Sequence, residues 1–405
     1  MEKYFVNSVV IGGGASGMLC SISMAQKNPN KKILLIEKEQ RLGRKLSATG
    51  NGRCNLSNLN IDQTCYCGTF QDGVNNILQK YPPQILLDKF ADLGLLCDND
   101  SEGRVYPYSR HCASVVDTLE NAINRHAVQV LYNTKVIDIK KEKRKFTITC
   151  NDTVIISDNV VVCVGGRSYS ALGSDGSLFK IIKSLGHTVT QLSPSLCPLM
   201  SNDRVLTTLK GVRARAKVTL LDDDIAIKSE IGEVQFTANS LSGICVFDLS
   251  RYFKNLKKPY VSVDLLPNSS IKEIFSLLNR NRGLFSGDNS PKIFTGIFHN
   301  NISQAIIAKA DKPSKLCNEL TDGDLYDIAK VIKNLKFHIT NTADFENSQV
   351  TSGGVLGSEI NSDTFESKII KGLYFCGEVI DVDGKCGGYN LHFAFASALN
   401  VGEKL

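Results

Sequence analysis

The sequence predicts an α/β protein in which a Rossmann-type sheet is built from both ends of the chain and interrupted by an insert. A hydrophobic strand at 9–11 leads into a glycine-rich turn and a helical pattern, and strand-to-glycine segments recur at 160–166 and 372–378. The pattern changes between them, first to short β-like runs and then to helical spacing. We therefore expect a discontinuous Rossmann-type domain at 1–190 and 338–405, an inserted β-barrel-like domain at 191–265 and a helical subdomain at 266–337.

The amino-terminal strand runs directly into GGGASG at 12–17. Gly12, Gly14 and Gly17 fit the GxGxxG pattern of dinucleotide-binding turns. The first glycine allows the tight turn, the second lets a pyrophosphate approach the backbone, and the third lets the next helix close on the strand. The start of that helix offers unpaired N–H groups to an anion. This segment predicts a dinucleotide site.

A second strand, 33–36, ends at Glu37, twenty residues after the last glycine of the motif. An acidic side chain at this point can accept hydrogen bonds from both hydroxyls of an adenosine ribose. Because the strand, the helix and Glu37 occur together, a glycine turn without a ligand does not explain this segment well. They serve FAD and NAD equally well, so other segments must decide between the two.

Three further segments favour FAD. The basic, glycine-dotted loop 41–55 can wrap a longer cofactor, and the strand ending at Gly165 and Gly166 resembles the return of the chain to the FAD sheet in two-dinucleotide-domain flavoproteins. Near the C-terminus, a strand ends at Gly377 and Glu378, and a glycine-led helix start follows. A carboxylate and a positive helix end at this place suit a ribityl chain and a reduced flavin.

With these segments in place, the chain resembles the bacterial aminoacetone oxidase-like, or NAD(P)/FAD-dependent oxidoreductase, flavoproteins, a family that includes a reductase of bile-acid dehydro-intermediates. The matching motifs are GGGASG at 12–17, GNGRCN at 50–55, GGRSYSALGSDG at 165–176, PSLCPL at 194–199, TSGGV at 351–355 and GLYFCGEVIDVDGKCGGYNLH at 372–392. Together with the dinucleotide motif, the resemblance implies FAD contacts from Gly12, Gly14, Ala15, Ser16, Gly17, Glu37, Lys38, Arg44, Lys45, Gly52, Arg53, Cys54, Asn55, Val136, Gly165, Gly377, Glu378, Asp381, Gly388, Tyr389, Asn390 and Leu391.

One stretch departs from the family pattern. Relatives carry Thr-His-x-Gly-Leu-Ser-Gly-Pro where this chain has TANSLSGI at 237–244, without the His and the Pro. If that His takes part in the chemistry of relatives, its loss puts activity here in question.

The middle of the chain begins with β-like runs at 217–221, 233–236 and 260–263 and continues with helical spacing at 271–278, 303–310 and 324–335. We expect the substrate pocket between this insert and the C-terminal segment. Tyr169, His187, His338 and His392 are possible proton donors, although a lone histidine is more often structural. No residue is predicted as the catalytic acid or base.

The predicted function is that of an FAD-dependent oxidoreductase acting on a small molecule, with NAD(P)H as a candidate transient electron donor. A disulfide reductase would need two cysteines beside the flavin, and the loop offers only Cys54. Two alternatives stay open: an FAD-dependent tRNA-modifying enzyme and a catalytically silent FAD-binding protein.

Composition limits other classes. A net charge of +6 over 405 residues, without a basic stripe interleaved with aromatics, gives no reason to expect a nucleic-acid partner. The thirteen cysteines lack paired CxxC spacing, so we predict no metal site. Without a secretory pattern at the start or an apolar run of membrane-spanning length, we expect a cytoplasmic protein with no membrane partner.

Overall fold

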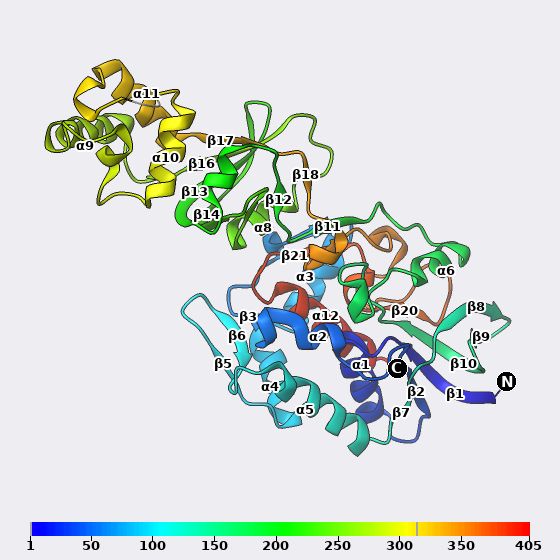
Figure 1. The fold of residues 1–405 in the computed structure, drawn as a ribbon. Coiled ribbons are helices and arrows are strands. Elements are labelled where there is room, and N and C mark those ends of the chain that lie inside the picture. The colour runs from blue at the N-terminus through cyan, green and yellow to red at the C-terminus, as the bar shows by residue number, and fades with distance from the viewer. Residues whose placement is uncertain (1, 313–314) are drawn as a thin grey trace. The chain divides into compact units, whose positions relative to one another are not determined.

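The computed structural model describes residues 2–312 and 315–405 (Figure 1). The chain divides into two compact units, one made of residues 1–194 and 348–405 and the other of residues 195–347. Each unit has its own hydrophobic core. Among the described residues, no helix combines the length and the hydropathy that a membrane crossing requires.

The first unit contains a seven-stranded mixed sheet of order β7-β2-β1-β10-β9-β8, with β20 also pairing with β10. Its strands are β1 (Glu2–Ile11), β2 (Ile33–Ile36), β7 (Gln129–Leu131), β8 (Val136–Glu142), β9 (Lys145–Cys150), β10 (Thr153–Val162) and β20 (Leu373–Phe375). Strands β7, β2, β1, β10 and β20 run parallel. The order reverses between β1 and β10, and ligands of such sheets bind at this place, beyond the carboxyl ends of the strands.

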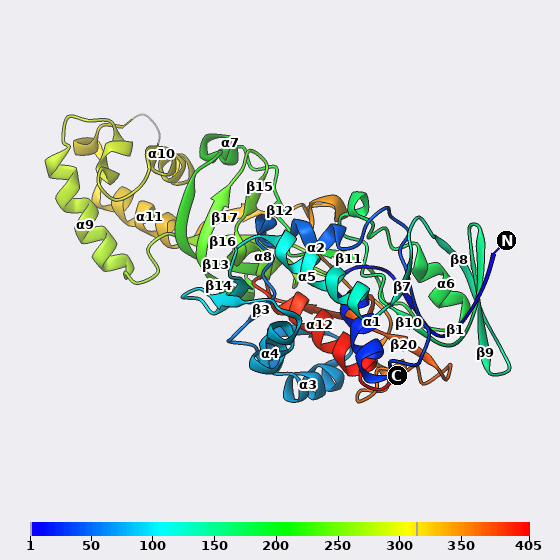
Figure 2. The same ribbon diagram turned by 90° about the horizontal axis from the view of Figure 1, so that it is seen from below.

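The helices of this unit are α1 (Ala15–Lys27), α2 (Arg44–Ala48), α3 (Gln71–Lys80), α4 (Pro83–Leu93), α5 (Cys112–Arg125), α6 (Leu178–Ser184) and α12 (Tyr389–Gly402), with 3₁₀ turns η1 (Thr49–Gly52), η2 (Gln63–Cys65), η3 (Ser170–Leu172), η7 (Gly357–Glu359) and η8 (Gly377–Val379). Helix α1 packs against α12 and α5, and Figure 2 shows α1 and α12 side by side. Chain segments more than 360 residues apart thus share one core. The smaller sheets are β3 (Ser57–Asn58) with β6 (Arg104–Pro107) and β5 (Cys97–Asn99), β4 (Tyr66–Gly68) with β21 (Val382–Gly384), and β11 (Ser193–Ser195) with β19 (Val350–Ser352).

The second unit is a seven-stranded antiparallel sheet with helices. Its strands are β12 (Leu199–Met200), β13 (Arg213–Asp222), β14 (Ile225–Phe236), β15 (Ser240–Ser242), β16 (Pro259–Asp264), β17 (Leu335–His338) and β18 (Asn341–Thr342). Its helices are α7 (Val205–Leu209), α8 (Ile244–Ser250), α9 (Ile271–Leu284), α10 (Asn300–Lys309) and α11 (Asp322–Lys333), with 3₁₀ turns η4 (Ser290–Phe294), η5 (Cys317–Glu319) and η6 (Phe345–Asn347). One core runs through both the sheet and the helices, so the structure does not separate the helical part as a subdomain of its own.

The boundaries of the insert differ from those expected at 191 and 337. Strand β17 pairs with β16, and β18 pairs with β12, so residues up to 347 belong to the inserted unit. At the other end, β11 pairs with β19, which keeps residues up to 194 in the Rossmann-type unit. Strand pairing between distant segments decides both boundaries, and the local sequence pattern does not contain it.

Candidate dinucleotide-binding site

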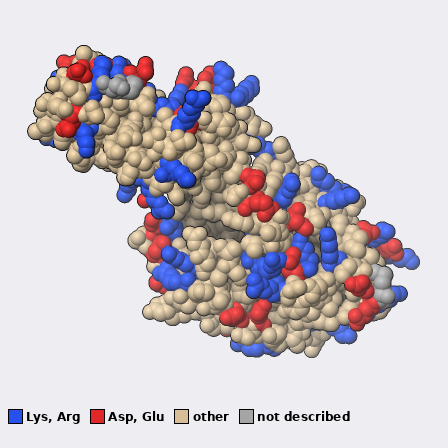
Figure 3. Space-filling model, viewed as in Figure 1, with Lys and Arg blue, Asp and Glu red and all other residues tan. Residues whose placement is uncertain are grey.

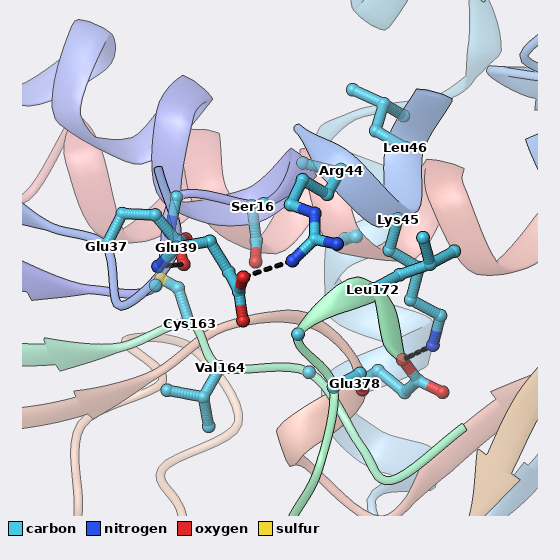
Figure 4. A pocket seen from close by; sticks show the side chains of 18 of the residues that line it. Ser16, Glu37, Glu39, Arg44, Lys45, Leu46, Cys163, Val164, Leu172 and Glu378 are labelled. Carbon is cyan, nitrogen blue, oxygen red and sulfur yellow. Dashed lines mark hydrogen bonds and ion pairs between the residues drawn. The ribbon is translucent and has the colours of Figure 1, made fainter. Parts of the chain in front are cut away.

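A deep pocket lies in the Rossmann-type unit, beyond the carboxyl ends of β1, β2 and β10 (Figure 4). It contains about 1410 Å³ of space free of protein atoms, including the solvent at its mouth. Its wall runs from the glycine turn at 12–16 to Asn390 and Leu391 at the start of α12, so an elongated ligand can lie along it. Every residue of its wall belongs to this one unit.

The three motif glycines have different surroundings. Gly12 has a φ of +103°, and a Cβ there would lie 2.6 Å from the carbonyl oxygen of Cys163. A Cβ on Gly17 would lie 1.8 Å from the carbonyl oxygen of Gly12. A Cβ on Gly14 would meet no protein atom within 4 Å. Gly12 and Gly17 are therefore required by the fold, whereas the absence of a side chain at Gly14 keeps space open at the start of α1.

Glu37 is held by the backbone on both sides of its carboxylate. Gly13 N–H donates to Oε2 at 2.7 Å, and Glu39 N–H donates to Oε1 at 2.9 Å. The carboxylate is thus oriented before any ligand binds, and each oxygen keeps a lone pair for a ribose hydroxyl. Gly13 was not predicted, although it is the middle one of three consecutive glycines. A Cβ there would lie 2.3 Å from Leu42 and 2.9 Å from Glu37.

Three predicted cations line the pocket, and each is paired with a carboxylate. Lys38 contacts Asp175 at 2.7 Å, and Lys45 contacts Glu378 at 2.8 Å. Arg44 pairs with Glu39, and its Nη2 also donates to the carbonyl of Ala171 at 2.9 Å (Figure 4). These pairs fix the side chains at the wall. Because the paired carboxylates partly neutralise the cations, the attraction of the cations for an anion in the pocket is weaker than that of free cations.

The segment that follows β10 covers part of the pocket. Residues 172–178 all contribute to the wall, and the contacts of Lys38 and Arg44 hold this segment. Ser174 is 4% exposed, and its Oγ has no hydrogen-bond partner. A buried hydroxyl without a partner is costly, and this one lies in the pocket wall. This segment overlaps the motif GGRSYSALGSDG at 165–176, of which only Gly165 was predicted to contact the cofactor.

The C-terminal turn lies at the start of α12. Gly388 has a φ of +102°, and a Cβ there would lie 2.2 Å from the carbonyl oxygen of Ser57 and 2.6 Å from Asn55 Oδ1. That oxygen of Asn55 is buried and has no hydrogen-bond partner. Asn390 caps the turn, since its Oδ1 accepts from Gly384 N–H at 2.7 Å. Asp381 accepts from the Thr69 hydroxyl at 2.9 Å, which ties the turn to the loop before α3.

The pocket wall brings together 13 of the predicted FAD contacts and leaves nine outside it. In the wall are Gly12, Gly14, Ala15, Ser16, Glu37, Lys38, Arg44, Lys45, Val136, Gly165, Glu378, Asn390 and Leu391. Outside it are Gly17, Gly52, Arg53, Cys54, Asn55, Gly377, Asp381, Gly388 and Tyr389. The wall also contains residues that the sequence analysis did not propose, among them Glu39, Thr134, Cys163, Ser174, Gln349 and Phe393.

Cys54 is buried in the left-handed region, with a φ of +57°. Burial raises the pKa of its thiol to about 12, against a smaller lowering by a hydrogen bond with Thr49. It is therefore a neutral thiol at physiological pH, which agrees with the argument against a disulfide reductase.

Two of the four possible proton donors have structural partners. His187 is bonded to Glu359 at 3.0 Å and to Ser367 at 2.9 Å. His392, at 0% exposure, donates from Nε2 to the carbonyl of Tyr81 at 3.0 Å and accepts at Nδ1 from the Ser57 hydroxyl at 2.9 Å. Neither lines the pocket. His338 is exposed on β17 of the other unit, and Tyr169 lies before η3 with a φ of +60°.

The burial of His392 predicts that the protein loses stability in mild acid. Burial lowers its pKa to about 4 from 6.5, so below pH 6.5 the unfolded chain binds a proton that the folded chain does not. The contribution of the neutral His392 to the free energy of unfolding is complete above pH 6.5. About 3 kcal/mol of it is lost as the pH falls from 6.5 to 4. We expect the melting temperature of the wild type to fall more steeply over this range than that of His392→Asn. His338→Asn, at an exposed position, should keep the wild-type slope; an unchanged slope in His392→Asn would contradict the assignment.

The parallel sheet, its glycine turn and the pocket define a dinucleotide-binding α/β protein of the Rossmann type. Specifically, the chain belongs to the family described as HI0933-like protein Rossmann domain, whose model matches residues 6–404. It is 33% identical over 399 residues to the 3-dehydro-bile acid delta(4,6)-reductase of Clostridium scindens, with 97% of each chain covered. It is 26% identical over 409 residues to the ribosomal RNA dihydrouridine synthase of Haemophilus influenzae, with 98% of each covered.

Among solved structures, the 3-ketosteroid delta1-dehydrogenase of Sterolibacterium denitrificans matches with a TM-score of 0.50 at 11% identity, and 99% of each chain is covered. This likeness concerns the fold. With the family match, it confirms the predicted Rossmann-type α/β class. The family match and the bile acid reductase relative confirm the prediction of an FAD-dependent oxidoreductase.

Proposed function

We propose that the protein uses FAD held in the pocket of the Rossmann-type unit to reduce a carbon–carbon double bond conjugated to a carbonyl in a small molecule, with NAD(P)H as the electron donor. The observation that carries the proposal is the pocket itself: a preoriented Glu37, an open space beside Gly14 and an unpartnered Ser174 hydroxyl on one wall. These features together suit the binding of a long anionic dinucleotide.

The residues present fit FAD. Glu37 would hold the adenosine ribose, and the N–H groups of Ala15 and Ser16 at the start of α1 would face the pyrophosphate. Ser174, which lies in the wall, would gain its missing partner from the ligand. No protein group satisfies the Ser174 hydroxyl in the described structure.

FAD, when bound, supplies two-electron chemistry at its flavin N5. The chain contributes charge and position. The start of α12, a helix of 14 residues, places its positive end beside Asn390 and Leu391 of the wall, where it favours negative charge on a reduced ring. Glu378 accepts from Thr351 N–H at 2.8 Å and from Lys45, so the ammonium of Lys45 is held at a fixed point of the wall.

The names of the two relatives suggest the bond that is reduced. A delta(4,6)-reductase of a 3-dehydro steroid acid and a dihydrouridine synthase both describe reduction of a C=C bond conjugated to a carbonyl. The higher identity to the bile-acid enzyme favours a small molecule. The RNA-directed relative supports a second candidate, reduction of a uridine in RNA. On the face seen in Figure 3, Lys and Arg are interspersed with Asp and Glu. This face therefore has no uniformly basic surface that would support RNA binding.

The test begins with the visible spectrum of the purified protein and its bleaching by NADH or NADPH without oxygen. We expect a bound flavin that is bleached, and that regains its colour when a 3-oxo-4,6-diene steroid is added. Recovery with a uridine-containing ribosomal RNA fragment and not with the steroid would favour the second candidate, and its dependence on salt should be steep. A protein that neither contains FAD nor binds it when added would contradict both.

A further inference from the structure

Three cysteines converge beneath the glycine-rich turn. Cys20 comes from α1, Cys163 follows β10 and Cys376 follows β20, and their exposures are 0%, 4% and 0%. In the register of the parallel pair, Val162 lies opposite Phe375, and Cys376 N–H donates to the carbonyl of Val162 at 3.0 Å. Cys163 and Cys376 are therefore the next opposed residues on neighbouring chains.

This placement suits a disulfide. Neighbouring strands lie about 4.8 Å apart, and opposed residues of parallel strands direct their Cβ atoms to the same side. That separation falls within the range of roughly 4.4–6.8 Å that disulfides span between Cα atoms. Within the described residues, no group of three or more His, Cys, Asp or Glu side chains could hold a metal ion, and this includes the three cysteines.

Cys163 also lines the pocket, as Figure 4 shows, whereas Cys20 and Cys376 do not. Cys163 is therefore the one cysteine of this cluster that adjoins the pocket. The backbone of Cys163 also packs closely against the glycine-rich turn, because a Cβ on Gly12 would lie 2.6 Å from the Cys163 carbonyl oxygen. A change of backbone at Cys163 would thus be transmitted to the turn that receives the pyrophosphate.

The surroundings of Cys163 favour its thiolate. Burial raises its pKa, but hydrogen bonds with Cys20, Cys376 and Ser16 outweigh burial and lower the pKa below that of an ordinary thiol. The pKa values of Cys20 and Cys376 are raised, the first chiefly by its hydrogen bond with Cys163 and the second chiefly by burial. Of the three, Cys163 therefore has the strongest tendency to ionise, and the neighbouring Cys376 is placed to act as a resolving cysteine.

We propose that Cys163 is an oxidisable thiol of the cofactor pocket, which peroxide converts to a disulfide with Cys376 when FAD is absent and which bound FAD protects. The thiolate attacks one oxygen of hydrogen peroxide and becomes a sulfenic acid, and hydroxide leaves. The thiol of Cys376 then attacks this sulfur, and water leaves as the S–S bond forms. Peroxide is the oxidant, and the two sulfurs together lose two electrons. The proposal rests on the proposed FAD site.

The test treats the full-length protein, as purified and after removal of FAD, with hydrogen peroxide. Alkylation of the remaining thiols and peptide mass spectrometry then locate any disulfide. We expect a Cys163–Cys376 peptide in the FAD-depleted protein and at least a tenfold lower yield in the FAD-loaded one. FAD rebinding, followed by flavin fluorescence, should fall after oxidation and return after dithiothreitol.

Cys376→Ala should stop the process at a Cys163 sulfenic acid, detected with dimedone, or divert it to Cys20. Cys245→Ala, at a buried thiol of the other unit whose pKa burial raises to about 11, should leave the disulfide yield unchanged. A Cys163 that stays reduced in FAD-depleted wild type, or equal yields with and without FAD, would overturn the proposal. These results differ from failure of the proposed function, in which the protein binds no FAD at all.

Discussion

Replacing Gly14 with valine is expected to weaken FAD binding at least about 100-fold, or roughly 2.7 kcal/mol, while the protein stays folded. The position has φ −82° and ψ −165°, which a β-branched residue adopts readily, and a Cβ there meets no protein atom within 4 Å. The added side chain would therefore occupy ligand space. The measurement is the dissociation constant of FAD, by quenching of flavin fluorescence, together with the melting temperature of the FAD-depleted protein.

Two variants control for this effect. Gly14→Ala adds one methyl group and should give an intermediate loss. Gly283→Val, in α9 of the other unit, adds the same side chain where a Cβ also meets nothing within 4 Å, and should leave FAD affinity unchanged. If Gly14→Val binds FAD as the wild type does, the pyrophosphate does not pass the start of α1.

The glycine turn and the Glu37 carboxylate of this pocket could be predicted from the sequence because their physics is local. A strand, a glycine turn and a helix follow one another within 36 residues, and each glycine has a steric reason that holds in any Rossmann-type turn. Gly14 and Glu37 illustrate this, since the space beside the first and the position of the second follow from spacing alone. The strand 372–376 could be predicted in the same way, from its hydrophobic run and the glycine that ends it.

The remainder depends on contacts between distant segments. The orphan hydroxyl of Ser174 and the ion pair of Lys38 with Asp175 exist because the segment after β10 returns over the pocket. The cluster of Cys20, Cys163 and Cys376 depends on the parallel register of β10 and β20, which lie more than 200 residues apart in the chain. No periodicity or motif spacing contains this information. The insert boundaries at 195 and 347 follow from β-pairing for the same reason.

Replacing Glu37 with alanine should reduce both FAD affinity and stability, unlike the change at Gly14. The carboxylate accepts two backbone N–H groups, and its loss leaves those of Gly13 and Glu39 without their partners. Each such loss costs about 1–3 kcal/mol where water does not replace the partner. We expect the melting temperature of the FAD-depleted protein to fall by several degrees and FAD to bind about 100- to 1,000-fold more weakly, since two charge-assisted bonds to a ribose disappear as well.

Glu37→Gln separates the two contributions. Its amide oxygen accepts from one N–H, while its NH₂ group faces the other N–H and cannot accept from it. FAD affinity should therefore lie between those of the wild type and the alanine variant, and stability should fall less. Glu102→Gln, at an exposed carboxylate paired with Arg104, controls for the loss of a charge and should change neither quantity. If Glu37→Ala lowers FAD affinity but leaves the melting temperature of the FAD-depleted protein unchanged, Glu37 contacts the ligand without organising the turn, and the backbone clamp contributes nothing to the fold.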